Sequence, residues 1–470
     1  MNYNKLQLII AFLFIFNFES VSGQIEKKPI ELKMGPHLFI DDYLIAEQSL
    51  LSRTVNNPVK IPNPIITGGK DGDENFQPYM SVLRDPDTGR FRIWYNTAEH
   101  ISQSHIGYMK SEDGIHWIRP HRVLKDPHQI KFGVTVLDRG KEFENQAQRY
   151  VLAFWHGDGM KIAVSADGLD WKMLTNKTVW EHNHDINSLH WDPIRKQYLA
   201  IGSVRLKHER WEGTQRIPHQ SVSKDLLTWE EKWPIFMAKI GAPIEEGETQ
   251  FYAMSGVISR GDLLIGLVKI LRDDLNATPG KIAKEMGDMD RKAAGLGYTV
   301  LAWTRDGRTW QRDHEPFMPN DPHPDAWDHA HVWGDEQIIV GDETFIYYGG
   351  YKRGHKVNRF NERQIGLARM PRDRYVAREA DLNMGSLITK SLILNGSSMT
   401  VNAYVLGEMR VRLLDQEGRP IKDFDWADIH GNAVDIPVRW KGDLVSLSKK
   451  PVRLEFQLQD AQLFGFDLHE

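Results

Sequence analysis

Short apolar runs alternate with polar turns along most of the chain, and this pattern predicts strands. From about residue 75 the runs are short and are bounded by Gly, Asp, Asn and Pro, which is typical of β-strands. Groups of about four runs return five times, and the opening runs are residues 79–83, 135–137, 186–191, 251–259 and 332–340. Repeats of four short strands every ~40–50 residues are typical of a β-propeller. We therefore predict an all-β fold with a five-bladed β-propeller over residues 30–384.

A second repeat supports this division of the chain. The pattern Ser/Thr-x-Asp-x-x-x-Trp occurs four times, beginning at Ser111, Ser165, Ser223 and Thr304. Three copies contain Asp-Gly, a tight-turn signal, because glycine accepts a positive φ and aspartate bonds its own backbone. At the fifth position the chain has Arg-Asp-Arg-Tyr over residues 372–375. We interpret the motif as a hairpin corner that ties the outer strands of each blade, and hence as scaffold.

Two stretches depart from the repeat. Residues 273–297 lengthen the fourth repeat with charged residues and a helix-forming run over residues 281–289. We predict that this insertion forms a lid over one propeller face. From residue 385 to 470 the pattern becomes plain alternating strands separated by Gly-containing turns, which predicts a small β-sandwich that braces the last blade.

The N-terminus has the features of an export signal. Lys5, an apolar run over residues 8–16 and small residues up to Gly23 match a signal peptide over residues 1–23. The apolar run is shorter than the ~20 residues that a membrane-spanning helix needs, and no transmembrane segment is predicted. We expect a periplasmic or secreted protein. The chain contains no cysteine, which excludes disulfides, thiolate metal sites and cysteine nucleophiles.

Charge and aromatic content narrow the ligand class. The net charge is -5, from 59 Lys+Arg and 64 Asp+Glu that form no long runs, so no nucleic-acid partner is predicted. Fifteen tryptophans in a polar, exported chain favour an oligosaccharide or polysaccharide ligand, because aromatic rings pack against sugar faces. Many of these tryptophans are expected in the core.

Acidic residues precede several of the inner strands. In a propeller these strands surround a central funnel, so side chains near their starts face one pocket. Two carboxylates in one pocket are what glycosidic cleavage requires, one as the acid and one as the base or nucleophile. Strand capping or solvation in a turn is the alternative for each acid taken singly. The acids at these positions are Glu74, Asp185, Glu248 and Asp328.

Histidine and arginine are concentrated in the same regions. His329 and His331 alternate along a predicted strand, so they point to opposite faces and are not expected to bind one metal together. No cofactor is predicted, although a single divalent ion in the funnel stays an alternative. Arg205 is suited to a carboxylate or sulfate on an acidic sugar, with a solvated loop arginine as the alternative. The predicted substrate-binding residues are Asp42, His184, Arg205, Asp328, His331 and His355.

The blade number, the corner motif and the placement of the acids resemble the five-bladed β-propeller glycoside hydrolases, such as families 32, 43, 62 and 117. The resemblance covers roughly residues 38–377. It implies that Asp185 is the aspartate that tunes a catalytic pKa and that Glu248 is the acid. The base or nucleophile is then Glu74, or one of Asp41 and Asp42. The β-strands after residue 385 resemble the sandwich often appended to such propellers.

These observations lead to one leading hypothesis and two alternatives. The leading hypothesis is a secreted glycoside hydrolase that removes terminal sugars from a plant or algal polysaccharide. A carbohydrate-binding propeller without catalysis is the first alternative. A sialidase-like hydrolase is the second, although its corner motif Ser-x-Asp-x-Gly-x-Thr-Trp is one residue longer than the repeat found here.

Overall fold

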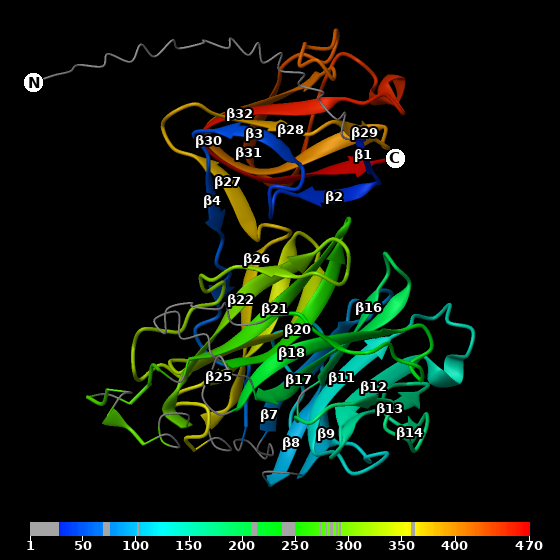
Figure 1. Ribbon diagram of the computed structural model, residues 1–470, viewed down its shortest axis with the longest axis vertical. Helices are drawn as coiled ribbons and strands as arrows, with labels where there is room; N and C mark the ends of the chain where they lie inside the picture. Colours follow the sequence, from blue (N-terminus) through cyan, green and yellow to red (C-terminus); the bar gives the residue numbers. More distant parts are fainter. Residues whose placement is uncertain are drawn as a thin grey trace, which may run out of the picture.

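The chain forms a ring of β-sheets with a second, smaller β-unit mounted on one end (Figure 1). The computed structural model describes residues 28–68, 76–100, 103–185, 187–207, 214–236, 250–272, 274–278, 280–282, 285–287, 290, 293–358 and 362–470. Among these residues, no helix has the length and apolarity needed to cross a bilayer. The predicted signal peptide lies outside the described residues, and so do residues 283, 284, 288 and 289 of the predicted helix at 281–289.

The ring consists of five blades, each an antiparallel succession of strands from the inside outward, and the fourth and fifth blades are joined into one nine-stranded sheet. Blade 1 contains β7 (Phe76–Arg84), β8 (Phe91–His100), β9 (Gln103–Ser111) and β10 (Arg122–Val123). Blade 2 contains β11 (Phe132–Asp138), β12 (Tyr150–Trp155), β13 (Gly159–Ser165), β14 (Lys172–Met173) and β15 (Trp180–Glu181), with the short 3-10 helix η1 (Gln146–Gln148) before β12. Blade 3 contains β16 (Asn187–Asp192), β17 (Gln197–Lys207), β18 (Thr214–Ser223) and β19 (Trp233–Pro234). Blade 4 contains β20 (Gln250–Arg260), β21 (Leu263–Arg272), β22 (Leu296–Thr304) and β23 (Gln311–Arg312). Blade 5 contains β24 (His331–Val340), β25 (Glu343–Tyr351) and β26 (Gln364–Pro371).

The five inner strands touch one another in a closed cycle. Each of β7, β11, β16 and β20 contacts the inner strand of the next blade, and β24 contacts β7 again. This cyclic order is the topology of a five-bladed β-propeller. The all-β class and the five repeats of the sequence prediction are therefore confirmed.

The N-terminal segment supplies the outer edge of the last blade. β5 (Val59–Lys60) and β6 (Ile66–Thr67) both pair with β26, so the first and last parts of the ring are joined by hydrogen bonds. Proline cannot donate to a central ladder, and the prolines around β5 are tolerated because this is an edge position. Lys60 reinforces the closure, since its Nζ lies 2.8 Å from the buried carboxylate of Asp328.

The four Ser/Thr-x-Asp corners have the predicted turn geometry. In blade 2, the hydroxyl of Ser165 accepts the N–H of Gly168 at 2.9 Å, and Asp167 accepts two further backbone N–H groups of the turn. Gly168 has a φ of 78°, and Trp171 closes the corner with 7 % of its surface exposed. The corner is scaffold, as the sequence predicted.

The corners also join neighbouring blades, which the sequence did not show. Trp94 of blade 1 donates its Nε1–H to the carbonyl of Gly168 in blade 2 at 2.7 Å. Tyr347 of blade 5 donates to the Gly114 carbonyl of blade 1 at 3.0 Å. Each of these corners is therefore a contact between two sheets as well as a turn within one.

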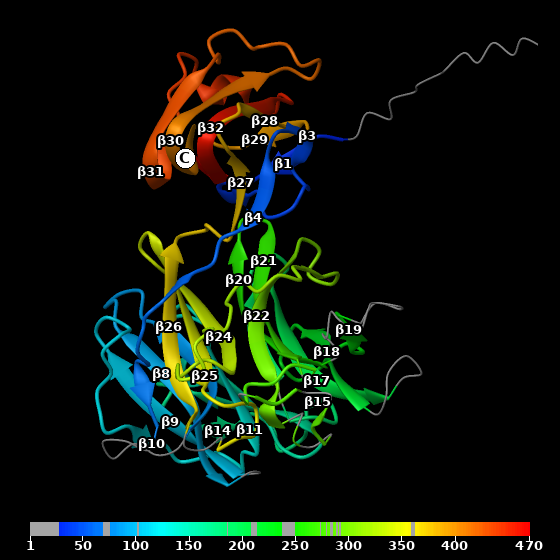
Figure 2. The same ribbon diagram turned by 90° about the vertical axis from the view of Figure 1, so that its left-hand side faces the viewer.

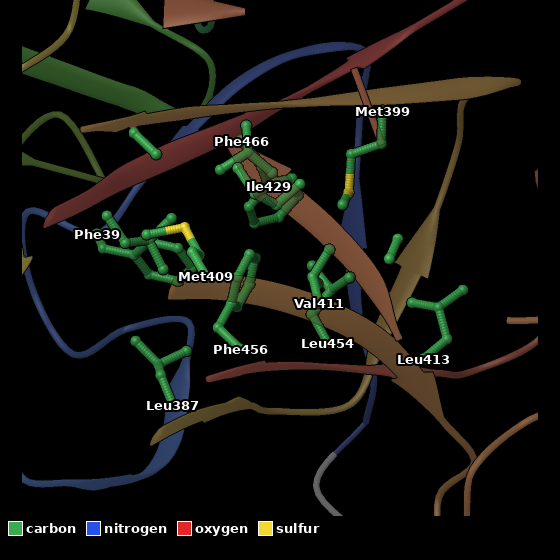
Figure 3. Close-up of a cluster of buried hydrophobic side chains, with 14 of the residues drawn as sticks. Phe39, Leu387, Met399, Met409, Val411, Leu413, Ile429, Leu454, Phe456 and Phe466 are labelled. Carbon is green, nitrogen blue, oxygen red and sulfur yellow. The ribbon is translucent and has the colours of Figure 1, made fainter. Parts of the chain in front are cut away.

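The second unit is built around two long strands, β30 (Ser398–Leu414) and β32 (Arg453–His469), in one eight-stranded sheet. Its buried core includes Phe39, Leu387, Phe456 and Phe466 (Figure 3). The pairing is a single sheet network, and the two-sheet sandwich predicted for residues 385–470 is not shown by it. The other strands of the unit are β2 (Gly35–Leu38), β3 (Ile45–Ser49), β4 (Ser52–Val55), β27 (Val376–Ala380), β28 (Gly385–Thr389) and β31 (Ala427–Pro437), beside the parallel pair β1 (Ile30–Leu32) and β29 (Leu392–Leu394) and the 3-10 helix η4 (Leu444–Leu447).

The predicted domain boundaries need correction at both ends of the propeller. The strands from β1 to β4, together with β27, belong to the second unit, although they were assigned to the propeller. Phe39 and Leu44 are completely buried in its core. An apolar strand looks the same in sequence whichever core it joins, so only the pairing decides. The chain thus enters the propeller through β4 and leaves through β27, and these two strands pair side by side (Figure 2).

The segment 372–375, where the fifth corner motif is missing, connects the propeller to the second unit. Asp373, with a φ of 66°, accepts Nε–H of Arg260 at 2.6 Å within the propeller. The next residue, Arg374, is buried and donates to Asn402 at 2.8 Å and to Asn432 at 2.6 Å, both in the second unit. Its burial lowers the Arg374 pKa to about 10. The Arg-Asp-Arg-Tyr sequence therefore replaces a turn by an inter-domain contact.

Gly168→Ala is expected to destabilise the propeller more than Gly140→Ala does. Both glycines have positive φ, 78° and 86°, and share that conformational cost of about 1 kcal/mol. A Cβ at Gly168 meets Trp94 at 2.8 Å, whereas none of the neighbours of Gly140 lies within 4 Å of its Cβ position. We expect an additional loss of about 1–3 kcal/mol for Gly168→Ala in urea unfolding followed by tryptophan fluorescence. Equal losses in the two variants contradict the inter-blade role of the corner.

Candidate active site

The inner strands all begin at the same end of the ring, which we call the mouth. β22 and β24 meet there in parallel at Gly297 and His331. The loops between the second and third strands of each blade reach this end as well. The second unit sits at the opposite end, where Arg260 and Arg374 anchor it. The mouth is therefore the open face of the propeller.

Asp185 lies at the mouth, immediately before β16, and is paired with a histidine. Its Oδ1 is 2.9 Å from Nδ1 of His184. Nε2 of the same imidazole accepts Nε–H of Arg216 at 3.1 Å. Since Nε2 is an acceptor, the proton of the neutral ring is on Nδ1, facing the Asp185 carboxylate. The geometry thus orients an Asp–His–Arg chain in which the Asp185 side chain keeps 25 % of its surface exposed.

Electrostatics keep Asp185 ionised. Burial acts to raise the pKa of Asp185, but the contact with His184 and the charges of Arg216 and Arg205 outweigh it and lower the pKa below its ordinary value. A carboxyl group that donates a proton near neutral pH needs a raised pKa instead. Asp185 is therefore suited to act as a carboxylate that tunes or positions its neighbours.

Two arginines stand side by side on the third blade at the mouth. Arg205 on β17 and Arg216 on β18 are direct partners in the antiparallel register. Directly opposed residues project to the same face of the sheet, with Cβ atoms roughly 4.5–5.5 Å apart. Both guanidinium groups act on the pKa of His184 and of Asp185. Blade 3 therefore presents two positive charges next to one carboxylate.

Blade 5 contributes buried imidazoles on the other side of the mouth. His331 is fully buried, and neither of its ring nitrogens has a hydrogen-bond partner among the described residues. Its ring lies 4.4 Å from that of Trp333 and 6.0 Å from that of His355. Burial lowers the pKa of His331 and of His355 well below the usual value, so both rings are neutral at pH 7. Arg363 is buried beside them, with its guanidinium carbon 4.8 Å from the centre of the Tyr351 ring.

Aromatic rings from several blades meet beneath these polar groups. Tyr79 of blade 1, Phe132 of blade 2 and Trp333 and Tyr351 of blade 5 belong to one buried cluster, against which Trp155 packs. Their rings are buried and form an apolar cluster between blades beneath the polar groups of the mouth.

The axis below the mouth is closed by a buried carboxylate, Asp335. Its Oδ2 accepts the backbone N–H of Met80 in blade 1 at 2.6 Å, and its Oδ1 accepts the hydroxyl of Ser255 in blade 4 at 2.9 Å. Lys269 of blade 4, itself 2 % exposed, forms an ion pair with the same carboxylate. Three blades are thereby joined on the axis.

Glu336 follows Asp335 and lines the narrow cavity on the axis. Burial, and then the negative charge of Asp335, raise the pKa of Glu336 to about 8. This carboxyl group is therefore largely protonated at pH 7. The pKa of Glu336 is raised, whereas the pKa of Asp185 is lowered. The two acids therefore have different electrostatic environments.

The structure brings together five of the predicted site residues and separates others. The five are Asp185, His184 and Arg205 on blade 3 and His331 and His355 on blade 5. Glu74 and Glu248, the predicted base and acid, lie outside the described residues.

Asp42 and its neighbour Asp41 are wrong as mouth residues. Asp42 pairs with Arg378 at 2.8 Å, and Asp41 pairs with Arg305 at 2.8 Å. Arg305 follows the end of β22 that is remote from the mouth, about 20–25 Å along the strand from Gly297. The preceding strand β2 pairs within the second unit. The pair of Asp41 with Arg305 therefore joins the two units, whereas Asp42 pairs with Arg378 within the second unit.

Asp328 is also wrong as a substrate-binding residue. Its side chain is 5 % exposed, and its Oδ2 accepts both Lys60 at 2.8 Å and the hydroxyl of Tyr348 at 3.1 Å. It holds the N-terminal edge strand on blade 5. The acid was placed correctly before an inner strand, but its side chain turns outward from the axis towards Lys60.

Sequence reasoning missed the axial pair Lys269 and Asp335. Lys269 interrupts the apolar strand β21, and Asp335 lies within β24, where Glu336 and Gln337 follow it. A lysine within an apolar strand was a signal for an internal ion pair. Among the described residues, no three His, Asp or Glu side chains are grouped so that they could hold a metal ion.

Comparisons with known proteins give distant likenesses in shape. No protein-family model matches the chain, and no curated protein sequence matches it. A glycosyl hydrolase from Bacteroides ovatus has a TM-score of 0.43 and 13% identity, covering 74% of this chain and 97% of that chain. A β-1,2-mannobiose phosphorylase from Listeria innocua has a TM-score of 0.43 and 12% identity, covering 67% and 97%. An N-acetylgalactosamine deacetylase from F. plautii has a TM-score of 0.40 and 15% identity, covering 69% and 96%. At these TM-scores and identities, the likenesses carry no argument about function. The function proposed below therefore rests on the residues of this chain.

Glu336→Gln is expected to remove a specific part of the pH dependence of stability. The folded protein keeps the Glu336 proton up to about pH 8, whereas the unfolded chain releases it near the ordinary glutamate pKa of 4.5. The folded state therefore binds more protons between these values, and wild-type stability falls as the pH rises. The slope contributed by this group approaches about 1.4 kcal/mol per pH unit.

The measurement is urea unfolding of wild type and Glu336→Gln at several pH values between about 5.5 and 7.5. The free energy of unfolding of the variant should increase relative to that of the wild type as the pH rises. Glu144→Gln, at an exposed position of the blade 2 loop, serves as the control and should follow the wild-type slope. Parallel slopes for wild type and Glu336→Gln contradict the raised pKa.

Proposed function

We propose that this protein is a carbohydrate-active enzyme that hydrolyses glycosidic bonds at the mouth of the propeller. The observation that supports this proposal most strongly is the Asp185–His184–Arg216 chain at the start of an inner strand. It provides a carboxylate that stays ionised, is partly exposed, and lies 2.9 Å from Nδ1 of a neutral imidazole. Preorganised charge of this kind is what a reaction with a developing cationic sugar centre requires.

Asp185 is proposed to tune and position the reacting groups, because its lowered pKa is unsuited to proton donation. Glu248 is proposed as the acid and Glu74 as the base. In sequence, each precedes the first residue of an inner strand by two positions, β20 for Glu248 and β7 for Glu74. Asp185 likewise precedes β16 by two positions. The three acids therefore occupy equivalent places in three repeats.

The closed axis supports attack at chain ends. The ion pair of Lys269 and Asp335 and the narrow cavity beside Glu336 leave no open channel through the described part of the ring. A ligand that enters the mouth then meets a floor formed in part by Tyr79 and Trp333. Such a pocket accommodates a terminal sugar better than an internal segment of a polysaccharide. We propose terminal sugars of a plant or algal polysaccharide as the substrate, encountered in the periplasm or outside the cell.

Asp185→Asn and Glu248→Gln are expected to abolish most of the turnover without unfolding the protein. Loss of the acid should lower kcat by roughly 10²–10⁴. For Asp185→Asn we expect a loss of at least about 10², because the amide no longer carries the charge that His184 and the arginines stabilise. The measurement is release of sugar from a panel of aryl glycosides and algal oligosaccharides, with circular dichroism to check the fold.

Asp170→Asn is the matched control, since Asp170 is an exposed acid in the blade 2 corner, remote from the mouth. It should keep wild-type turnover. Full activity of Glu248→Gln contradicts its role as the acid. If wild type binds glycans but releases no sugar from any of them, the protein is a carbohydrate-binding propeller and the hydrolase proposal fails.

A further inference from the structure

We propose that the cleft between the propeller and the second unit is a second binding site, separate from the mouth, and that its ligand is an uncharged oligosaccharide. The inference goes beyond the proposed function, because it concerns a different surface and needs no turnover. Four observations on described residues support it. They are a cavity of suitable size, an aromatic wall, charges that the protein itself satisfies, and hydrogen-bonding groups without a protein partner.

The first observation is the cavity itself. It has a volume of about 590 Å³, within the roughly 300–1,000 Å³ of small-molecule sites. It lies where β4 approaches the propeller and β22 ends, at the boundary of the two units (Figure 2). β22 begins at the mouth, so the cleft is at the other end of this strand. Tyr43 and Arg53 line it from the second unit, and Trp303, Arg305 and Gln311 line it from blade 4.

The second observation is an aromatic wall that is already in place. Tyr43 keeps 41 % of its surface exposed, and the guanidinium carbon of Arg305 lies 4.3 Å from the centre of its ring. Trp303 lines the floor of the cleft, and the guanidinium carbon of Arg53 lies 5.3 Å from the centre of its ring. Cations at these distances attract the rings and hold them in position. Sugar rings pack against aromatic surfaces, and surfaces that are already ordered lose little entropy on binding.

The third observation is that the arginines of the cleft are satisfied by the protein. Arg53 is held by a bidentate contact with Asp313, at 2.8 and 3.0 Å. Arg305 pairs with Asp41 at 2.8 Å and with Asp262 at 2.6 Å. An anionic ligand would therefore have to compete with carboxylates that are already bound to both cations.

The exposed carboxylates of the cleft have partners as well. Asp42 pairs with Arg378 at 2.8 Å. Asp306 accepts the backbone N–H groups of two residues of its own corner, Arg308 and Thr309, at 2.7 Å each. Carboxylates and guanidinium groups in such pairs still have lone pairs and N–H groups to offer, and hydroxyl groups use both. The arrangement therefore favours an uncharged ligand that is rich in hydroxyl groups.

The fourth observation is a set of hydrogen-bonding groups without a protein partner. Trp303 is 6 % exposed, and its Nε1–H finds no acceptor among the described residues. In the same part of the chain, the hydroxyl of Tyr43 and the amide of Gln311 have no hydrogen-bond partner, and both side chains are exposed. A buried donor without an acceptor is costly, and a ligand hydroxyl in the cleft that accepts it removes this cost. The cleft thus offers an indole donor, a phenol and an amide to one ligand.

The experiment measures the binding of hexasaccharides to the full-length protein carrying Glu248→Gln, so that no ligand is consumed. The neutral probes are xylohexaose, mannohexaose, cellohexaose and agarohexaose, and hexagalacturonic acid is the charged comparison. Isothermal titration calorimetry gives the affinity and the number of molecules bound per chain. We expect at least one neutral hexasaccharide to bind at least as tightly as the charged one.

Tyr43→Ala removes the exposed ring and is expected to weaken the binding of one hexasaccharide per chain by at least about tenfold. Gln311→Ala removes only an exposed amide and should weaken the same binding by about two- to tenfold. Trp303→Phe keeps a ring without the N–H and should give a loss of similar size. Trp191→Ala is the matched control, since Trp191 is an aromatic residue of blade 3 with 43 % of its surface exposed, and it should bind as the parent protein does. Thermal unfolding checks the fold of each variant.

Three outcomes overturn the inference. The first is that none of the neutral hexasaccharides binds. The second is that Tyr43→Ala and Gln311→Ala bind as tightly as the parent protein, or that Trp191→Ala binds as weakly as they do. The third is that hexagalacturonic acid binds more tightly than every neutral probe. Binding in the cleft without turnover by wild type refutes the hydrolase and keeps this inference, whereas turnover with binding that the cleft variants leave unchanged keeps the hydrolase and refutes this inference.

Discussion

The buried carboxylate of Asp335 is the interaction on which the ring depends most. It accepts hydrogen bonds from blades 1 and 4 while belonging to blade 5, and Lys269 neutralises its charge at the axis. A buried charge is tolerated only when it is paired and hydrogen-bonded, so each of these partners is required by the others. Removal of Lys269 alone would leave an uncompensated charge among five inner strands. The position of the blades around the axis, and hence the shape of the mouth, follows from this arrangement.

The two ends of the propeller have different tasks. At the closed end, Arg374 and the neighbouring Arg260–Asp373 pair attach the second unit, and Asp41 and Arg305 extend this contact. These ion pairs are satisfied within the protein and hold a large surface in place. At the mouth, Arg205 and Arg216 of blade 3 lie near the ionised Asp185, and Arg363 of blade 5 is buried beside the backbone carbonyl of His355.

The repeat in the sequence was sufficient to predict the blades, but it was not sufficient to predict which side chains form the candidate site. Asp185 and Asp328 both precede inner strands, and from position alone they were equivalent candidates. In the structure, Asp185 is a mouth residue beside His184, whereas Asp328 is a buried partner of Lys60. The edge strand that carries Lys60 comes from residues more than two hundred positions away in the chain. Such a partner has no local signature, so the roles of the two acids could not be separated from the sequence.

The all-β class, the number of blades and the scaffold role of the Ser/Thr-x-Asp corners could be predicted from local sequence. These features depend on local periodicity and on turn chemistry, which short stretches of residues encode. Only the tertiary structure decided which core residues 30–55 join, which aspartates face the mouth and which arginines stand opposite each other. These features depend on strand pairing and on the direction of side chains across the ring. A strand that pairs with a different strand can place its residues at a different end of the molecule. Arg205 and Arg216 show this most clearly, because their opposition exists only in the register of β17 with β18.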